Sequence, residues 1–182
     1  MLTKQERDRQ FPRVQIWRRA IAFGIDFVGV WILSSLLGSN APGFGLVETI
    51  VFIAGWFATR VLVPYNNFGQ TLGRYALDIK LISPRIGKVP DLQALCQREA
   101  VTGLGALLVA IALSYLASNI AVVLLIAPLA IDCSFALADA NGYRQAFHDR
   151  IAKTIAISTR RGYSLDIKVK RLLATIGNRV QK

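Results

Sequence analysis

Long apolar stretches alternate with polar, positively charged connections along this chain of 182 residues. Four stretches are close to the roughly 17–25 residues that an α-helix needs to cross the hydrocarbon layer of a bilayer. They cover residues 16–37, 44–63, 101–117 and 120–138. The pattern predicts an all-α membrane protein with four transmembrane helices.

The net charge of +11 is distributed asymmetrically, and its distribution predicts the topology. None of the 22 basic residues falls within 38–59 or 101–143. With four helices, all the basic segments lie on one side of the membrane, which the positive-inside rule identifies as the cytoplasm. A single helix over 101–138 would instead move the C-terminal cations outside. We therefore expect both termini to be cytoplasmic, and the charge requires no nucleic acid partner.

Other features of the composition narrow the class of protein further. The single histidine, His148, excludes a multi-histidine metal site within one chain, and no cofactor motif is present. The segment before the first span is polar, and no small-residue cleavage site follows that span, so the span is expected to be an anchor. We expect a multi-pass protein of a bacterial inner membrane, or of an internal photosynthetic membrane, that is not an enzyme.

The basic connections predict a small cytoplasmic layer beneath the spans. Residues 78–83 and 151–158 alternate like short strands, and IKLI is expected to pair with TIAI in an antiparallel manner. Pro64 and the following residues 65–69 are expected to end the second helix, and Asp91 to cap a helix that runs through Gln97 toward the third span. A glycine-framed turn is expected at the surface, with Thr71 capping a short helix that bears Arg74 and Tyr75; it contains Gly69, Gln70, Thr71 and Gly73.

Three of the predicted spans place ionisable residues in the cytoplasmic half of the bundle, among them Asp26, Arg60 and Asp132. An isolated charge there costs about 2.5 kcal/mol or more, so these side chains should face inward and find partners. From their depths we expect Arg60 to pair with Asp132, whereas Asp26 is either protonated or bonded to a neighbouring helix. Such charges either form a proton path or fix helix register, and register is the favoured interpretation.

Small and aromatic residues suggest how the spans pack and where they end. The third span has a small residue at every fourth position, and the fourth span carries a similar series, which allows close helix contact. These series are Thr102, Ala106, Ala110 and Ser114, followed by Ala130, Ser134 and Ala138. Trp17, Trp31 and Trp56 lie in the first two spans, and we expect them to anchor the helices at the headgroup level.

The C-terminal segment has the clearest helical periodicity. Large apolar residues fall on one face, and cations occupy the remainder. This pattern predicts a basic amphipathic helix in the anionic headgroup layer, with docking on a partner subunit as the alternative. The expected contact residues are Leu165, Lys168, Val169, Arg171, Leu172, Leu173 and Ile176.

Three stretches together resemble the RDD family of small integral membrane proteins, named for an arginine and two aspartates. They are RRAIAFGID with Arg19 and Asp26, GQTLGRYALDIKLI at 69–82, and FHDRIAKTIAI at 147–157 with Asp149. Arg98 also matches a position that is usually basic in the family, whereas Lys153 departs from a common glycine. The resemblance implies a membrane fold over residues 1–159, with the basic tail 160–182 outside it. Family members have been suggested as transporters, including cation/proton antiporters.

Two functions from different classes remain open. One is a non-enzymatic accessory, scaffold or assembly protein of a larger respiratory or photosynthetic membrane complex. The alternative is a small oligomeric transporter, a cation/proton antiporter that uses intramembrane carboxylates. The spans contain no visible inverted repeat of the kind many transporters have, which favours the first. The expected partners are membrane lipids with anionic headgroups, and other membrane subunits or further copies of the chain. Asp149 is expected to cap a helix or pair with Arg98 or Arg74, rather than act with His148 in catalysis.

The topology predicts opposite accessibility for two engineered thiols. In a chain whose own cysteines are replaced by alanine, a membrane-impermeant thiol reagent applied from outside should label Ser39→Cys and leave Ser164→Cys unmodified. Ser39 lies in a connection without positive charge, and Ser164 lies in the basic tail. Mass spectrometry of the labelled chains measures the difference, and equal protection of the two sites would contradict the topology.

Overall fold

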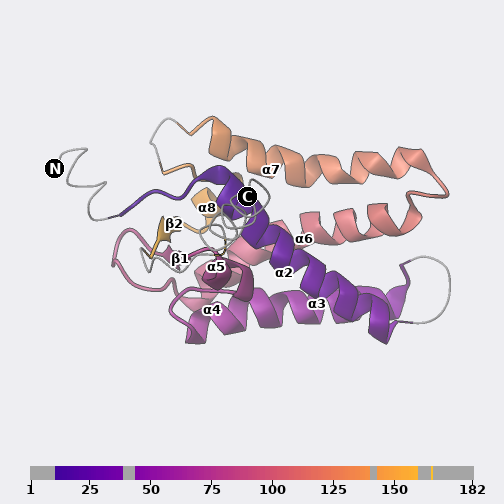
Figure 1. The fold of residues 1–182 in the computed structure, drawn as a ribbon, viewed down its shortest axis with the longest axis horizontal. Coiled ribbons are helices and arrows are strands. Elements are labelled where there is room, and N and C mark those ends of the chain that lie inside the picture. The colour runs from indigo at the N-terminus through magenta and orange to yellow at the C-terminus, as the bar shows by residue number, and fades with distance from the viewer. Residues whose placement is uncertain (1–10, 39–43, 140–142, 160–164, 166–182) are drawn as a thin grey trace, which may run out of the picture.

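The computed structural model describes residues 11–38, 44–139, 143–159 and 165. Four helical segments long and apolar enough to cross a membrane form an extended bundle (Figure 1). A two-stranded sheet and two short helices gather at one end of it, called the sheet end below. The predicted mostly helical, four-span fold is confirmed.

The first span is helix α2, Ile16–Leu37, which runs diagonally across the bundle (Figure 1). Its buried positions recur at helical spacing on one face, which packs against the second span and against α5, Leu72–Ala76. The exposed positions are mostly large and apolar. A helix with apolar residues around its whole circumference is typical of a membrane span.

The second span changes its helical geometry partway along. It comprises α3, Leu46–Phe57, then a π-helical turn, Ala58–Leu62, then α4, Val63–Asn66. The helix ends at Asn66, within the stretch from Pro64 to Gly69 that was expected to end it. Proline has no N–H and its ring clashes with the carbonyl four residues earlier, which here belongs to Arg60. The wider π turn relieves this clash, so the helix continues for a few residues past the proline.

The third and fourth spans form an antiparallel hairpin. Helix α6 runs from Leu92 to Tyr115, so the helix expected after Asp91 and the third span are one element. The fourth span begins as a 3₁₀ helix, Ile120–Ile126, and continues as α7, Ala127–Leu137. Because a 3₁₀ residue rises about 2.0 Å and an α residue about 1.5 Å, this span is roughly 30 Å long, close to the hydrocarbon thickness.

The predicted strand pairing is confirmed at the sheet end. Strand β1, Ile79–Ile82, pairs antiparallel with β2, Ile155–Ser158, with Ile79 opposite Ser158. Helix α8, Phe147–Ile151, precedes β2 and packs against α6 and α7. A single bridge from Arg13 to Ile157 adds the N-terminal segment to the sheet.

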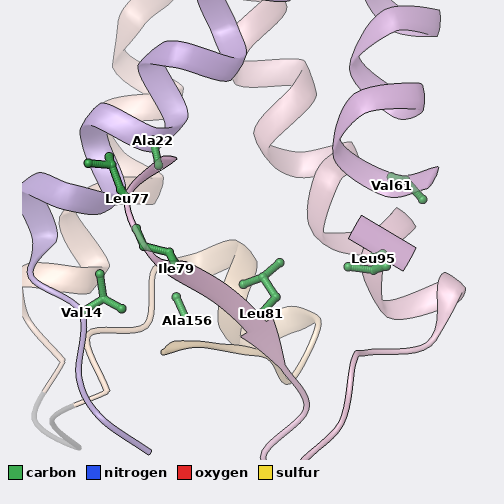
Figure 2. Packing of buried hydrophobic residues seen from close by; sticks show 8 residues of the cluster. All are labelled: Val14, Ala22, Val61, Leu77, Ile79, Leu81, Leu95 and Ala156. Carbon is green, nitrogen blue, oxygen red and sulfur yellow. The ribbon is translucent and has the colours of Figure 1, made fainter. Parts of the chain in front are cut away.

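The two larger of three apolar clusters hold the bundle and the sheet together. Figure 2 shows the cluster at the sheet end, where side chains of both strands meet residues of the spans. Its members are Val14, Ala22, Val61, Leu77, Ile79, Leu81, Leu95 and Ala156. The second cluster lies deeper in the bundle and is mostly aromatic, with Phe52 and Trp56 stacked 5.7 Å apart. Trp56 is only 1 % exposed, so its expected place at the headgroup level is wrong.

The predicted amphipathic tail lies outside the described residues, apart from Leu165, which is exposed. In the third span, the small residues Thr102, Ala106 and Ala110 are buried, as expected for close contact between helices. In the fourth span, by contrast, Ala130, Ser134 and Ala138 are exposed. That series therefore faces away from the other helices of its own chain.

Replacing Lys153 by glycine should stabilise the fold. Lys153 follows the end of α8 with φ +50° and is exposed. Left-handed backbone costs a non-glycine residue roughly 1–2 kcal/mol, whereas glycine adds about 0.5–1 kcal/mol of chain entropy to the unfolded state. Lys153→Gly should thus raise the free energy of unfolding by up to about 1 kcal/mol, measured by thermal unfolding in detergent. Lys153→Ala removes the same side chain but keeps the strain, so equal stability of the two variants would contradict this account.

Candidate functional site, a buried network of ion pairs

The network is centred on Glu99, a fully buried residue near the start of α6. Three arginines donate to its carboxylate. Arg60 does so through Nε at 2.7 Å, Arg74 through Nη2 at 2.9 Å and Arg98 through Nη1 at 2.5 Å. The Thr102 hydroxyl, one turn further along α6, donates at 2.9 Å. One carboxylate thereby joins the second span, the third span and the short helix α5.

Asp26 occupies the middle of α2 and is bonded to two other elements. Its carboxylate accepts hydrogen bonds from Arg60 Nη1 at 2.8 Å, Thr71 Oγ1 at 2.6 Å and the Gly73 amide at 2.8 Å. Gly73 allows α5 to come this close, because a Cβ there would lie 2.0 Å from the Ala22 carbonyl oxygen. An aspartate inside an apolar helix is accommodated here by complete pairing with a cation and two neutral donors.

Arg60 is held by aromatic rings as well as by carboxylates. Its guanidinium carbon lies 4.8 Å from the centre of the Trp56 ring and 5.1 Å from that of Phe23. Such cation–π contacts strengthen when the cation is desolvated. The π turn that accommodates Pro64 contains Arg60, so the irregular turn and the buried cation occupy the same place in the helix.

Asp149 forms the second centre of the network, at the start of α8. Arg98 donates to it through Nε at 3.0 Å, Arg19 donates through Nη2, and the Ala146 amide donates at 3.2 Å. Burial alone would raise the pKa of Asp149, but Arg19 and Arg98 outweigh burial and hold that pKa well below its usual range. The expected salt bridge to Arg98 is present, and Arg19 is an additional partner.

Asp132 is bonded to His148, so the expected pairing of Arg60 with Asp132 is wrong. The Asp132 carboxylate lies 2.5 Å from His148 Nδ1 and accepts a bond from the His148 amide at 2.9 Å. The other ring nitrogen of His148 lies 3.0 Å from Arg98 Nη2. Depth within the membrane was a poor guide here, because α7 packs on α6 and α8, whereas Arg60 faces α2 and α6.

The glycine-framed turn of residues 69–73 connects the sheet to this network. Gln70 donates to the Ile79 carbonyl at 2.8 Å, and Gly69, with φ +79°, accepts from the Leu81 amide at 3.0 Å. Thr71 caps α5 as expected, since its hydroxyl accepts from the Arg74 amide at 3.2 Å while donating to Asp26. These residues hold the network in place, and their polar atoms are directed into the protein.

The sequence interpretation missed the central residue, Glu99. A signal was present, because Glu99 lies three residues before Thr102 and therefore continues the face of Thr102, Ala106 and Ala110 by one turn. Arg98 was singled out by family resemblance and Arg74 as a possible partner of Asp149. Neither could be assigned to Glu99 without knowing that α6 begins well before the membrane span proper.

The charges of the network balance. Arg19, Arg60, Arg74 and Arg98 face Asp26, Glu99, Asp132 and Asp149, with His148 joined to both sets. Removing one partner of a buried ion pair is far more costly than the pair itself is stabilising, because an uncompensated charge remains. Among the described residues, no group of three or more His, Cys, Asp or Glu side chains could hold a metal ion.

Four apolar spans joined at one end by buried ion pairs define a polytopic α-helical membrane protein. The model of the RDD family matches residues 13–153, so the chain belongs to the RDD family. No curated protein and no solved structure matches the chain. Of the residues expected to carry the family pattern, Arg19 and Asp149 are direct partners, and Asp26 pairs with Arg60. The departure at Lys153 falls at a left-handed position, where glycine is favoured.

Substituting Glu99 by glutamine should destabilise the protein strongly. The change keeps the shape of the side chain but leaves Arg60, Arg74 and Arg98 without their shared carboxylate. We expect a loss of about 3–5 kcal/mol of unfolding free energy, measured by denaturant titration in mixed micelles.

Asp91→Asn is the matched control for this change. It is the same acid-to-amide replacement on an exposed residue at the start of the same helix, and it should change stability by no more than about 0.5 kcal/mol. Similar losses in Glu99→Gln and Asp91→Asn would show that the network does not stabilise the fold.

Proposed function

We propose that this RDD-family protein is a non-enzymatic accessory or assembly subunit of a larger membrane complex, of the respiratory or photosynthetic type. In this proposal the sheet end faces the cytoplasm of a bacterium, and the protein binds its partner through the lipid-facing surface of the fourth span. The buried ion pairs then serve to hold the helices in register, so that this surface is presented in one geometry.

The observation that carries the proposal is the outward-facing series of small residues on α7. Ala130, Ser134 and Ala138 follow one another at four-residue spacing and are all exposed. In membranes, helices associate where small residues allow their backbones to approach, because lipid provides no hydrophobic contrast. The other series, on α6, is covered by helices of the same chain. By analogy, the series on α7 is suited to a helix from another chain.

The limited packing of the fourth span supports the same interpretation. Only 11 % of the most apolar 18-residue stretch of this span is buried by the rest of the chain, whereas 28–39 % of the corresponding stretch is buried in the other three spans. No residue of its 3₁₀ portion, Ile120–Ile126, is buried. A span with so little cover from its own chain has most of its circumference available for a partner helix.

The arrangement of charges favours an accessory role over proton transport. Every network carboxylate is already engaged by an arginine or by His148, so an exchanging cation would have to compete with that partner. Beyond the network, an apolar cluster of Phe27, Val30, Phe52, Ala106 and Ala110 packs around Trp56. Glu48, in the first turn of α3, is also buried, but the side chains of this cluster that follow it toward Arg60 on the second span, Phe52 and Trp56, are not titratable.

One observation favours the alternative, a cation/proton antiporter. The imidazole of His148 bonds Asp132 and lies beside Arg98, so a side chain that can either donate or accept a proton joins two charged residues. A movement of α7 relative to α8 would break the contact between His148 and Asp132. The transporter therefore stays as the second candidate function, and the experiment below separates the two.

Substituting Ser134 by tryptophan should release the partner complex. Partners retained after native purification of the full chain, quantified by mass spectrometry, should fall to background in Ser134→Trp, since the large ring prevents close helix contact. Ser35→Trp is the matched control. Ser35 is also an exposed serine bonded to a carbonyl of its own helix, but it lies on α2, so partner retention should be unchanged.

Two outcomes would contradict the accessory role. The first is equal partner retention in the Ser134→Trp and Ser35→Trp variants. The second is cation exchange driven by a pH gradient in vesicles containing only this protein, lost in Asp26→Asn, which would establish the transporter.

A further inference from the structure

A cavity of about 200 Å³ lies between α2 and α7 at the sheet end. Phe23 on α2 and Leu129 on α7 form its sides, and Ile79 and Leu81 of β1 lie at its base. It reaches the surface at Ala20 and Cys133, both of which are exposed. Because these residues belong to two membrane spans, the opening faces the region occupied by lipid.

The wall of this cavity combines mostly apolar side chains with four arginines, Arg19, Arg60, Arg74 and Arg98. Cys133 and His148 also line it, whereas none of the lining residues is an aspartate or glutamate. The carboxylates that balance these arginines in the network are not among the residues that line the cavity. The cavity is therefore a place where positive charge is exposed to a largely apolar space.

Arg74 has a donor that no described residue uses. Its Nη2 bonds Glu99 at 2.9 Å, but its Nη1 is buried without a hydrogen-bond partner. The residue is 4 % exposed, so bulk water does not satisfy that nitrogen freely. Leaving a buried charged donor unpaired is costly, which makes such a group a marker for a missing acceptor.

The electrostatic surroundings of Arg74 indicate that the missing acceptor is an anion. Burial, followed by repulsion from Arg60 and Arg98, lowers the pKa of Arg74 to about 9. Glu99 is the nearest carboxylate, and Arg74 shares it with both of those arginines. An added negative charge beside Nη1 would offset this repulsion and complete the hydrogen bonding at once.

We propose that the cavity binds one anionic lipid, with its headgroup beside the guanidinium of Arg74 and an acyl chain lying between α2 and α7. A volume of 200 Å³ is below the roughly 300–1,000 Å³ of most small-molecule pockets, so it accommodates the anionic group while the chain continues outside. The opening faces the lipid, and this favours a lipid as the occupant, because a free anion would enter from water. This inference goes beyond the accessory role and does not depend on it.

The test measures lipid retention by the purified full-length protein. Native mass spectrometry follows binding of phosphatidylglycerol, phosphatidylcholine with the same acyl chains, and inorganic phosphate. We expect one phosphatidylglycerol per chain to persist under conditions that remove phosphatidylcholine, and inorganic phosphate to displace it poorly. Arg74→Gln should weaken phosphatidylglycerol binding by about tenfold or more, as expected for a hydrogen bond to a charged group.

A second variant keeps the test decisive if Arg74→Gln does not fold. Cys133→Trp fills the mouth of the cavity without changing any charge of the network, and it should abolish phosphatidylglycerol retention. Ser134→Trp adds the same ring at the next residue, which does not line the cavity, and should leave retention unchanged. Ser134→Trp is also the variant expected to lose the partner complex. Lipid retention and partner retention are therefore measured separately, and each proposal can fail without the other.

Three outcomes would overturn the proposal. One is equal retention of phosphatidylglycerol and phosphatidylcholine. Another is unchanged phosphatidylglycerol binding in Cys133→Trp. The third is displacement of the lipid by inorganic phosphate at comparable concentration, which would make the cavity a site for a free anion.

Discussion

Three guanidinium groups converge on the Glu99 carboxylate, and the positions of most other elements follow from that convergence. Arg60 arrives from the second span, Arg98 from the third and Arg74 from a short helix outside the membrane spans. None of them can move far alone, because each would leave a buried charge without its counterion. A bundle of apolar helices in lipid has little hydrophobic preference for one register over another. Ion pairs at one end supply that preference.

The requirement to pair these charges also accounts for local irregularities in the chain. The π turn around Arg60 widens the second span where Pro64 would otherwise clash, and the buried cation lies within the same turn. Gly73 lacks a Cβ where α5 meets the Ala22 carbonyl, so the Gly73 amide can reach Asp26. Both irregular features lie at contacts between elements far apart in the sequence. Both features therefore support the same contacts between elements that the ion pairs hold.

Hydropathy and charge distribution were sufficient to predict the spans and the paired strands, because both signals are local. Ion-pair partners are not local. Asp132 and Arg60 were expected at similar depths, yet Asp132 bonds His148 and Arg60 bonds Asp26 and Glu99, so the expected pairing was wrong. Glu99 was overlooked because the span it belongs to begins at Leu92, earlier than its apolar run suggests. The available clue was its position on the small-residue face of α6. Only the packing of the helices shows that this face brings Glu99 to the arginines.

The network holds the fourth span through fewer residues than the other three, and this difference connects the two proposals. Spans one to three are joined directly through Asp26, Arg60 and Glu99. The fourth contributes only Asp132, which reaches the network through His148. Helix α7 is thus tied to the network at one residue, with the cavity on the side toward α2 and the exposed small series on its outer surface. A lipid held in the cavity would fill the space that α7 leaves beside α2, and would fix the orientation in which its outer surface meets another helix.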